Sequence, residues 1–485
     1  MAKLAQQFMN EKTAPGAWFL LLVPLVFLLL RYSTRKQKNQ QPGLLHLPPS
    51  PPALPILGHL HLIGSLPHVS LRNLAAKHGA DLMLLRLGAM PALLVTSPRA
   101  AEAVLRTHDH VLASRPHSLA TEIIMYGHSD IGFAPYGECW RQAKKLVTTH
   151  LLNTNKGVSM VMAKISEAAA AVDMTRLFGS FMNDLACRAV MGKDFQNKGL
   201  DMQFLELIAD TSPLISKFNM EEYFPFLARF GVLSKTVRGK SERVKRRWDK
   251  LLDGLIQEHE TCQHLNILVR YPTYNLLSYD LNYEWTGRVL WGIETSASTL
   301  DFTIAELMRR PDLMSKLQVD VRRKVPEGQE LVSEANLADI NYLRAVIKET
   351  LRLHPVTPVL AHFSMSSCSI DGFEVPARVR ILINAWVIGR DERFLEDTEE
   401  FVPERFLDGG GATDVDFKGN NFRFSPFGFG RRMCPGMNFG VVAMELVLAN
   451  LVHHFDWDVP PGQDKCTIDM SEVFGIVVHR KRSYS

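Results

Sequence analysis

The chain has 485 residues, of which 46% are hydrophobic and 22% are charged, and its formal net charge is +4. This composition is that of a folded protein with a large core, and it excludes collagen-like and globally disordered chains. The net charge is too small to indicate a nucleic-acid-binding protein. Six cysteines without a CxxC pair favour free thiols in a reducing compartment over a zinc site or a disulfide framework.

An apolar segment near the N-terminus predicts a membrane anchor. Residues 14–30 are 17 consecutive residues without a charge, which is at the short end of what spans a bilayer. Basic residues follow at once: Arg31, Arg35, Lys36 and Lys38. A cleaved signal peptide is the alternative, but there the charges precede the apolar run and a small-residue cleavage site follows it. The positive-inside rule therefore predicts a lumenal segment at 1–13 and a transmembrane signal anchor at 14–31.

A stiff linker is expected at residues 32–59, between the anchor and the rest of the chain. It begins with basic residues and continues with several prolines. Proline fixes the backbone angle φ and donates no hydrogen bond, so an extended connector is expected. Residues 60–485 then form one large domain, in which no internal repeat is visible.

The pattern of this domain predicts a mainly α fold with small β-sheets. Helices are expected at 71–78, at 98–107, through much of 157–260, and in an apolar stretch that ends before Pro311. Short β-like runs occupy 83–95, where Gly88 and Pro91 are expected to break them, and a strand is expected at 379–384. Asp371 and Gly372 predict a hairpin turn.

The most informative stretch is a glycine-rich loop around Cys434, which reads FGFGRRMCPG over residues 427–436. A thiolate needs help to stay deprotonated, and backbone N–H groups of a glycine-bent loop before a helix lower a cysteine pKa. An apolar helix is expected at 437–451, with Pro435 in its first turn. Arg432 can pair with an anion, and Phe427 can shield the sulfur from water.

This loop resembles the haem-binding signature F-x-x-G-x-R-x-C-x-G of the cytochrome P450 superfamily, with all fixed positions matched: Phe427, Gly430, Arg432, Cys434 and Gly436. The resemblance implies haem b, with the Cys434 thiolate as the axial ligand of the iron. It extends from residue 14 to residue 482 and is closest to plant microsomal members of the A type. The alternative is a buried structural cysteine in a glycine-rich turn.

A second pair of motifs carries the same resemblance. Glu349 and Arg352 lie three residues apart, so they share the face of a helix that ends before Pro355. The segment 403–406 reads PERF, as in the family. The resemblance implies that Arg405 joins Glu349 and Arg352 in a buried ion triad, which fixes geometry next to the cysteine loop.

Two shorter motifs complete the predicted site. The stretch from Trp140 to Lys144 reads WRQAK and resembles the family's W-x-x-x-R helix, so Trp140 and Lys144 would reach a haem propionate. Residues 292–296 read GIETS and resemble the family's oxygen-binding segment. The resemblance makes Glu294 and Thr295 catalytic residues that relay protons to bound oxygen.

Three places depart from the family pattern. Trp291 stands where a small residue is expected, and a tryptophan there could block the distal pocket. His362 stands where the family usually has an arginine that binds a propionate. Residues 261–285 read as a loop-like aromatic segment instead of the expected approach to a long distal helix.

The resemblance implies a haem-dependent monooxygenase on the endoplasmic reticulum membrane, with a single span and its catalytic domain in the cytosol. One atom of O₂ would enter an apolar small molecule, such as a terpenoid, a phenolic or a similar specialised metabolite. Electrons would come from NADPH through NADPH-cytochrome P450 reductase, which could dock on a basic face at Arg141, Lys145 and Arg431. The family's substrate contacts fall on four segments: 114–130, 205–230, 356–360 and 473–477.

Two alternatives keep the fold and change the function. Trp291 could exclude O₂, which would leave a haem-thiolate isomerase or dehydratase that needs no reductase. The departures could instead describe a catalytically impaired, membrane-anchored partner protein.

Overall fold

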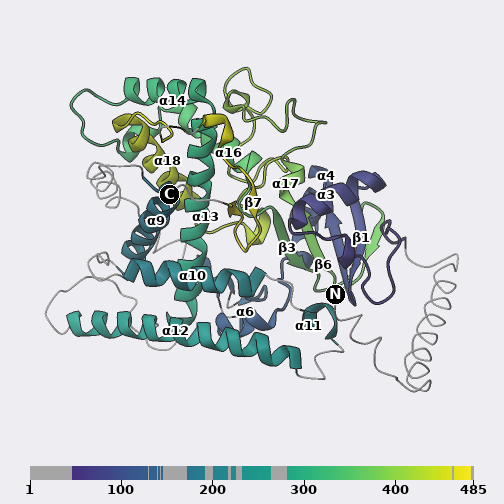
Figure 1. Ribbon diagram of the computed structural model, residues 1–485. Coiled ribbons are helices and arrows are strands. Elements are labelled where there is room, and N and C mark those ends of the chain that lie inside the picture. Colours follow the sequence, from purple (N-terminus) through teal and green to yellow (C-terminus); the bar gives the residue numbers. More distant parts are fainter. Residues whose placement is uncertain are drawn as a thin grey trace, which may run out of the picture.

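The computed structural model describes residues 46–481 except for residues 129, 139, 143, 146–171, 192–199, 217–219, 226–231, 264–280, 461 and 463. The predicted mainly α fold with small β-sheets is confirmed (Figure 1). Among the helices of this described part, none is long and apolar enough to cross a bilayer. The anchor predicted at 14–31 lies outside the described residues.

Helices make up most of the molecule, and two of them organise it. Helix α13 (Leu281–Arg309) runs through the middle, and α12 (Val232–Gln263) crosses one end of it (Figure 1). The other α-helices are α3 (Pro67–His78), α4 (Pro98–Glu102), α5 (Asp109–Leu112), α6 (Leu119–Ile124), α9 (Met174–Met191), α10 (Leu200–Ser216), α11 (Met220–Tyr223), α14 (Pro311–Lys324), α15 (Glu334–Leu337), α16 (Asn341–Leu353), α17 (Ala385–Ile388) and α18 (Met437–His454).

Prolines and glycines set several helix ends. Helix α13 ends before Pro311, as predicted, and Pro311 opens α14 in the first turn, where its missing N–H costs nothing. Helix α18 begins at Met437, and Gly436 takes the capping position before it. Pro435 therefore precedes the helix, and its predicted place in the first turn is wrong.

One prediction about helix extent is confirmed and another is wrong. The helix expected at 98–107 is present, since α4 continues without a break into a π-helical turn, η2 (Ala103–Thr107). The segment 261–285 was expected to be loop-like, but 261–263 end α12 and 281–285 begin α13. No proline interrupts residues 281–309, so continuing the helix keeps the backbone hydrogen bonds satisfied. Residues 264–280 lie outside the described chain.

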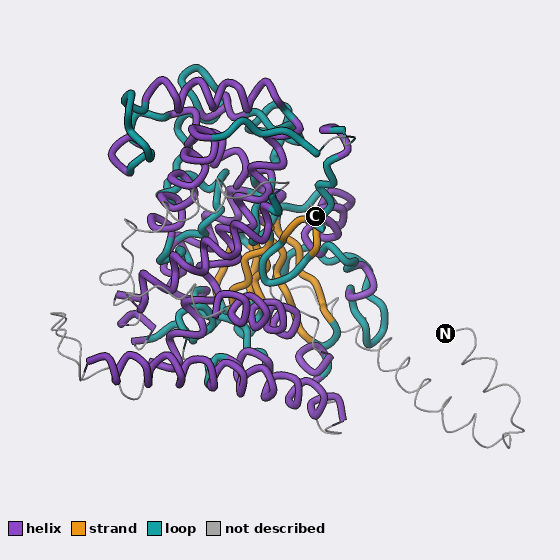
Figure 2. Tube along the Cα trace, turned by 60° about the vertical axis from the view of Figure 1, so that its left-hand side comes forward, coloured by secondary structure: helices purple, strands orange, loops and turns teal. Residues whose placement is uncertain are grey.

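The main sheet has four strands in the order β1 (Leu82–Leu87), β2 (Met90–Val95), β6 (Arg380–Asn384) and β3 (Val359–Phe363). Strands β2 and β6 are parallel, and the other pairs are antiparallel. Pro91 lies within β2 instead of breaking it, because the pairing with β6 starts only at Ala92 and needs no N–H from Pro91. Figure 2 shows the strands near the middle of the molecule in that view, with helices on either side of them.

Two small hairpins complete the fold. Strands β4 (Cys368–Ile370) and β5 (Phe373–Val375) are joined by Asp371 and Gly372, with φ of 51° and 80°. The hairpin turn predicted there is confirmed, because positive φ at both central residues is typical of the tightest turns. Strands β7 (Glu472–Val473) and β8 (His479–Arg480) form the second hairpin, near the C-terminal end.

The cysteine loop lies between two hydrophobic cores. Helices α9, α10, α12, α13, α16 and α18 share the larger core, and the sheet with α4 and η2 forms the second. Phe427 packs against the first core, whereas Phe429 is buried in the second, where it stacks on Phe422 at 4.2 Å. Both ends of the loop are therefore anchored in rigid packing.

Candidate active site

The loop around Cys434 is closed by its own backbone. The Cys434 N–H donates to the Phe427 carbonyl at 2.9 Å, and a short 3₁₀ turn, η6 (Gly430–Arg432), precedes the cysteine. Gly430 has φ 63°, and a side chain there would come within 2.5 Å of the Leu105 carbonyl oxygen. Only glycine fits this position without strain, so the sequence motif reflects a real steric demand.

The Cys434 thiol is accessible, yet it lies deep within the protein. Burial raises its pKa, while the Gly436 backbone N–H and the nearby Lys144 ammonium act in the opposite direction. The residue is exposed although protein atoms surround its sulfur, so the sulfur is not packed against side chains on every side. A metal bound to the sulfur would add the positive charge needed to keep it as a thiolate.

Asp109 shapes the loop from outside it, and the motif gave no hint of this role. Its Oδ2 accepts hydrogen bonds from the Arg431 backbone N–H and from Arg431 Nη1, both at 2.9 Å. The carboxylate is buried and lies against Gly430. Asp109 stands 325 positions before Cys434 in the chain (434 − 109), and no spacing rule could link the two.

Next to the loop, three cationic or titratable side chains lie together in the interior: Arg115, His362 on β3, and Arg432. Arg432 Nε donates to the Ala113 carbonyl at 2.7 Å, and Arg115 Nε donates to the Gly132 carbonyl at 3.1 Å. His362 Nδ1 lies 3.0 Å from the Leu112 carbonyl. No carboxylate of the described chain forms an ion pair with either arginine, and Arg432 Nη1 has no hydrogen-bond partner there.

In this cation cluster, burial and mutual repulsion disfavour the charged forms of the side chains. Burial, with repulsion from Arg115, lowers the Arg432 pKa to about 9, and burial lowers the Arg115 pKa to about 10. Burial and the two arginines lower the His362 pKa to about 3, so His362 is neutral. Asp130 attracts both arginines without bonding to either. The cluster fits an anion, since a buried cation needs a partner.

Arg115 is a residue that the sequence prediction missed. It fell within the segment 114–130, which was assigned as a whole to substrate contacts. One arginine in a chain with 22% charged residues carries no signal of its own. His362, in contrast, was predicted here, and the structure places it beside Arg115 and Arg432.

Trp140 and Lys144 lie on the same side of the loop. The Trp140 indole N–H donates to the Ile131 carbonyl at 2.8 Å, and its ring lies 4.4 Å from the Arg432 guanidinium carbon. Lys144 Nζ donates to the carbonyls of Arg431 and Met433, at 2.8 and 2.9 Å. Trp140 therefore supports the cation cluster, and Lys144 holds the backbone on both sides of Arg432.

Glu294 and Thr295 lie on α13, the long central helix. Glu294 Oε2 is buried without a hydrogen-bond partner among the described residues, and burial raises the carboxyl pKa to about 7. Ser296 Oγ would lie 3.4 Å from a Cβ on Gly440 of α18, so this stretch of α13 lies close to the helix that follows Cys434. Trp291 lies within α13, but its side chain is outside what the structure describes.

The structure brings the predicted ion triad together. Arg352 Nε and Nη2 donate to the two carboxylate oxygens of Glu349, at 2.7 and 2.8 Å, and Arg405 Nε donates at 3.1 Å. The remaining guanidinium N–H groups bond to backbone carbonyls of 389–400, which fixes that segment. Every charge in this cluster has its partner within the protein.

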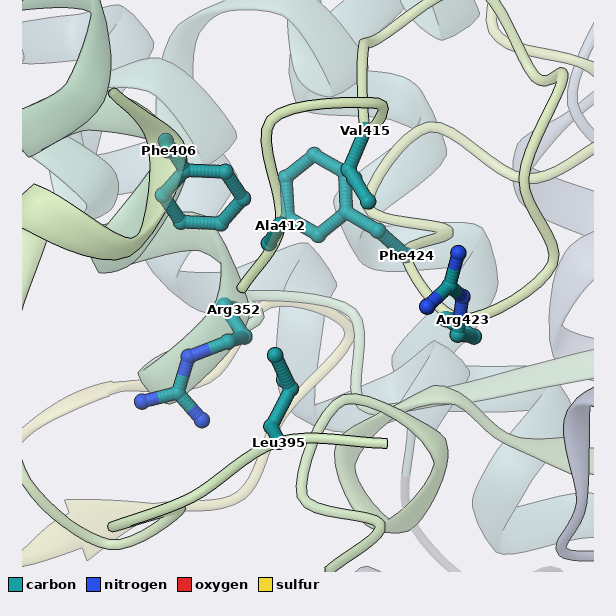
Figure 3. A pocket seen from close by; sticks show the side chains of 7 residues that line it. All are labelled: Arg352, Leu395, Phe406, Ala412, Val415, Arg423 and Phe424. Atoms are coloured by element: carbon teal, nitrogen blue, oxygen red, sulfur yellow. The ribbon is translucent and has the colours of Figure 1, made fainter. Parts of the chain in front are cut away.

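A small pocket lies beside the triad, and it belongs to a different part of the molecule from the cysteine site. Figure 3 shows the side chains that line it, with the Arg352 guanidinium turned away from the two phenyl rings. Its lining residues are Arg352, Leu395, Phe406, Ala412, Val415, Arg423 and Phe424. Neither Cys434 nor Glu294 is among them, so we assign this pocket no chemistry.

The residues of the cysteine site fit a haem. A haem carries two propionates, which the cation cluster can neutralise. It also carries an iron, which the Cys434 sulfur can bind as a thiolate. Both observations are independent of the sequence motif. They favour a haem site over the alternative of a structural cysteine, whose thiol would be packed against side chains.

Comparison with known proteins gives a consistent result. The sequence profile of the family "Cytochrome P450" matches residues 48–484. The chain is 46% identical to the indole-2-monooxygenase of Zea mays, over 98% of this chain and 96% of that protein. It is 45% identical to the indolin-2-one monooxygenase of the same plant, over 95% and 94%. A zebrafish cytochrome P450 structure with progesterone matches with a TM-score of 0.72 at 22% identity, over 86% of this chain and 98% of that one.

Proposed function

Because the chain belongs to the cytochrome P450 family, we propose that Cys434 binds the haem iron and that the substrate is a small indole-type molecule. The protein is a haem-dependent monooxygenase of the plant type. It inserts one atom of O₂ into a small specialised metabolite and uses electrons from a redox partner. The residue roles and the substrate class are the parts that we propose.

One observation supports the assignment of Cys434. Of the thiols that the structure describes, it is the one that is exposed while protein atoms surround its sulfur, and it lies beside a cation cluster in which neither arginine forms an ion pair. Arg432 and Arg115 would hold the propionates, with Trp140 supporting Arg432, and His362 would line the same site as a neutral side chain. Lys144 and Asp109 would hold the loop in the shape that presents the sulfur. Phe427 and Gly436 flank the thiol and would limit access of water to it.

Haem, when bound through a thiolate, supplies the iron at which O₂ is activated. The chain's own contribution on the distal side is proton supply. With a pKa of about 7, Glu294 holds a proton at neutral pH and can release it, which suits a general acid. Thr295 is its neighbour on α13 and would pass that proton towards the oxygen.

The proposed substrate class is supported by the names of three relatives and by the apolar residues in the segments expected to contact substrate. Three relatives from Zea mays, 42–46% identical, are named for indole, indolin-2-one and 3-hydroxyindolin-2-one. In the segments that the family uses for substrate, Val356 and Val477 are buried apolar residues near Phe302 of α13. Such a lining suits a flat apolar ring system.

The proposed partners are NADPH-cytochrome P450 reductase and membrane lipid. Arg141 and Arg431 both approach Tyr136, so the two cations lie side by side near the cysteine loop, and Lys145 follows on the same helical stretch. Exposed apolar residues lie at the end of the linker and just after it: Leu54, Ile56, Leu57 and Leu62. With the apolar run at 14–30, they support attachment to the endoplasmic reticulum membrane through a single N-terminal span.

The test uses purified holoenzyme with the reductase, NADPH and ¹⁸O₂. We expect indole or indolin-2-one to gain one labelled oxygen atom, and we expect no product when the reductase is omitted. Cys434→Ser is the matched control, since it removes only the sulfur. If no indole-type compound is oxygenated by the wild type, the substrate class is wrong. If turnover proceeds without reductase, an isomerase or dehydratase is favoured instead.

A further inference from the structure

Two acidic and two histidine side chains meet at a place that the haem site does not include; three of them are buried and Glu472 is partly buried. They come from elements far apart in the sequence: His68 of α3, Glu306 of α13, His354 at the C-terminal cap of α16, and Glu472 of β7. His68 Nε2 lies 2.8 Å from Glu472 Oε2, and His354 Nε2 lies 2.8 Å from Glu306 Oε1. His354 Nδ1 faces Glu472 Oε1 at 3.9 Å. Glu472 therefore lies between two histidines: His68 is within hydrogen-bond distance of its carboxylate, and His354 lies too far from it for a hydrogen bond. This arrangement is called the histidine clamp below.

The clamp holds Glu472 as an anion. Burial opposes ionisation of this carboxyl, but the contacts with His354 and His68 outweigh it and lower its pKa to about 2. Arg390 adds a positive charge from the side of α17, and Arg309 pairs with Glu306 at 3.3 Å. Removing one partner of such a buried group is costly, because the other partners keep their desolvation penalty.

Glu472 opens the segment 473–477, which is fixed at both ends. At its far end, the Val478 N–H donates to the Val356 carbonyl at 2.8 Å. Within it, Val477 is buried against Phe302 and Val356. Gly475 approaches α10, since a Cβ there would lie 3.2 Å from Ser212 Oγ. The clamp at Glu472 thus determines how this segment lies against α13.

The clamp also touches α13 directly. The His354 ring stacks on Phe302, with centroids 4.6 Å apart and planes 5° apart, and Phe302 follows Thr295 by two helical turns. The Phe474 ring lies 6.3 Å from the His68 ring. One set of contacts therefore joins the distal helix to the segment 473–477.

We propose that Glu472 is a positioning residue for substrate selection: the two histidines hold its carboxylate, and so place the segment 473–477 against α13. The inference rests on the proposed function, in which this segment contributes to the substrate site. Loosening the clamp widens or shifts the distal site while the haem and its thiolate stay in place. Large apolar ligands then lose affinity, and a ligand that contacts only the iron does not.

The experiment compares two azoles on the holoenzyme by spectral titration. Clotrimazole carries three phenyl rings that fill a distal site, whereas imidazole needs little beyond the iron. We expect Glu472→Gln to raise the Kd of clotrimazole at least about fivefold and to leave that of imidazole within about twofold. Glu472→Asp, which keeps the charge, should recover part of the loss. Glu445→Gln is the control, because Glu445 is a carboxylate still more deeply buried than Glu472, and it pairs with Arg344 instead.

Equal loss of both azoles, or no loss of either, overturns the proposal. If Glu472→Gln does not yield holoenzyme, His68→Gln removes one clamp partner and must show the same selective loss, or the proposal falls. Azole binding needs no O₂, reductase or indole, so a failure of the clamp is distinct from a failure of the proposed function. The latter is seen only as absent oxygenation by the wild type.

Discussion

Two of the buried clusters of charged side chains in the described chain, the ion triad and the cation cluster, differ in one respect. In the triad of Glu349, Arg352 and Arg405, the carboxylate is paired with two guanidinium groups, and the spare N–H groups bond to carbonyls. In the cluster of Arg115, His362 and Arg432, two arginines lie together and one N–H has no partner within the described chain. In the first cluster, the protein itself supplies every partner. The second cluster needs an anion from outside the chain to pair with its arginines, which marks it as a binding site.

The comparison predicts that breaking the triad damages the fold more than any other change considered. Glu349→Gln leaves two buried guanidinium groups without a counter-charge, so the free energy of unfolding should fall by about 3–5 kcal/mol. Denaturant titration of the holoenzyme measures this. Arg310→Gln breaks an ion pair with Asp312 at the surface and should cost less than about 1 kcal/mol. Equal costs for the two variants would contradict the distinction.

Another buried ionisable group, Glu294, extends the comparison because its effect on stability depends on pH. Folding raises the pKa of its carboxyl from 4.5 to about 7. Between pH 4.5 and 7 the folded chain therefore keeps this proton, whereas the unfolded chain has lost it. The stability contributed by this proton is complete below pH 4.5 and is lost as pH rises through 7. Glu294→Gln should therefore match wild type at low pH and exceed its unfolding free energy by roughly 3 kcal/mol above pH 8. Parallel pH profiles of the two proteins would contradict the buried position of this carboxyl.

A substitution in the cation cluster should affect haem binding more than stability, which is the opposite of a substitution in the triad. Arg432→Gln removes a repelling charge as well as a ligand for the anion, so the protein should lose haem rather than stability. The rate of haem transfer to apomyoglobin should rise about 10- to 100-fold. Arg423→Gln, which breaks the pair with Asp414, should leave that rate unchanged. A loss of folding comparable to that of Glu349→Gln would show that Arg432 is structural.

His362 should give the smallest effect in the same cluster. Its pKa of about 3 makes it neutral, and its single N–H, on Nδ1, donates to the Leu112 carbonyl, so it brings no charge to an anion. His362→Gln should raise the rate of haem transfer by only a few-fold, because the change disturbs one neutral hydrogen bond, which contributes about 1 kcal/mol. An effect as large as that of Arg432→Gln would mean that His362 carries a proton in the holoenzyme.

The sequence predicted the parts of the site that lie within local motifs. The loop at 427–436, the pair Glu349 and Arg352, and the turn at Asp371 are each set by neighbours a few residues apart, so spacing alone reveals them. Asp109 and Arg115 were missed because they reach the loop through tertiary folding.

The same limit explains the errors of secondary structure. The start of α13 at Leu281 looked like a loop because the segment 261–285 is rich in aromatic residues, yet Leu281–Arg309 contains no proline and forms one continuous helix. Pro91 looked like a strand breaker, and only the register with β6 shows that its N–H is not needed. The histidine clamp joins four elements across more than 400 positions, from His68 to Glu472, so no local sequence pattern predicts it.

The most direct test of the account is the absorption spectrum of reduced Cys434→Ser with carbon monoxide, beside that of the wild type. The account predicts the thiolate-haem band in the wild type and its loss in the variant, because serine offers no sulfur to the iron. A variant that keeps the band would place the iron on another residue. The cation cluster would then need a different anion to explain it.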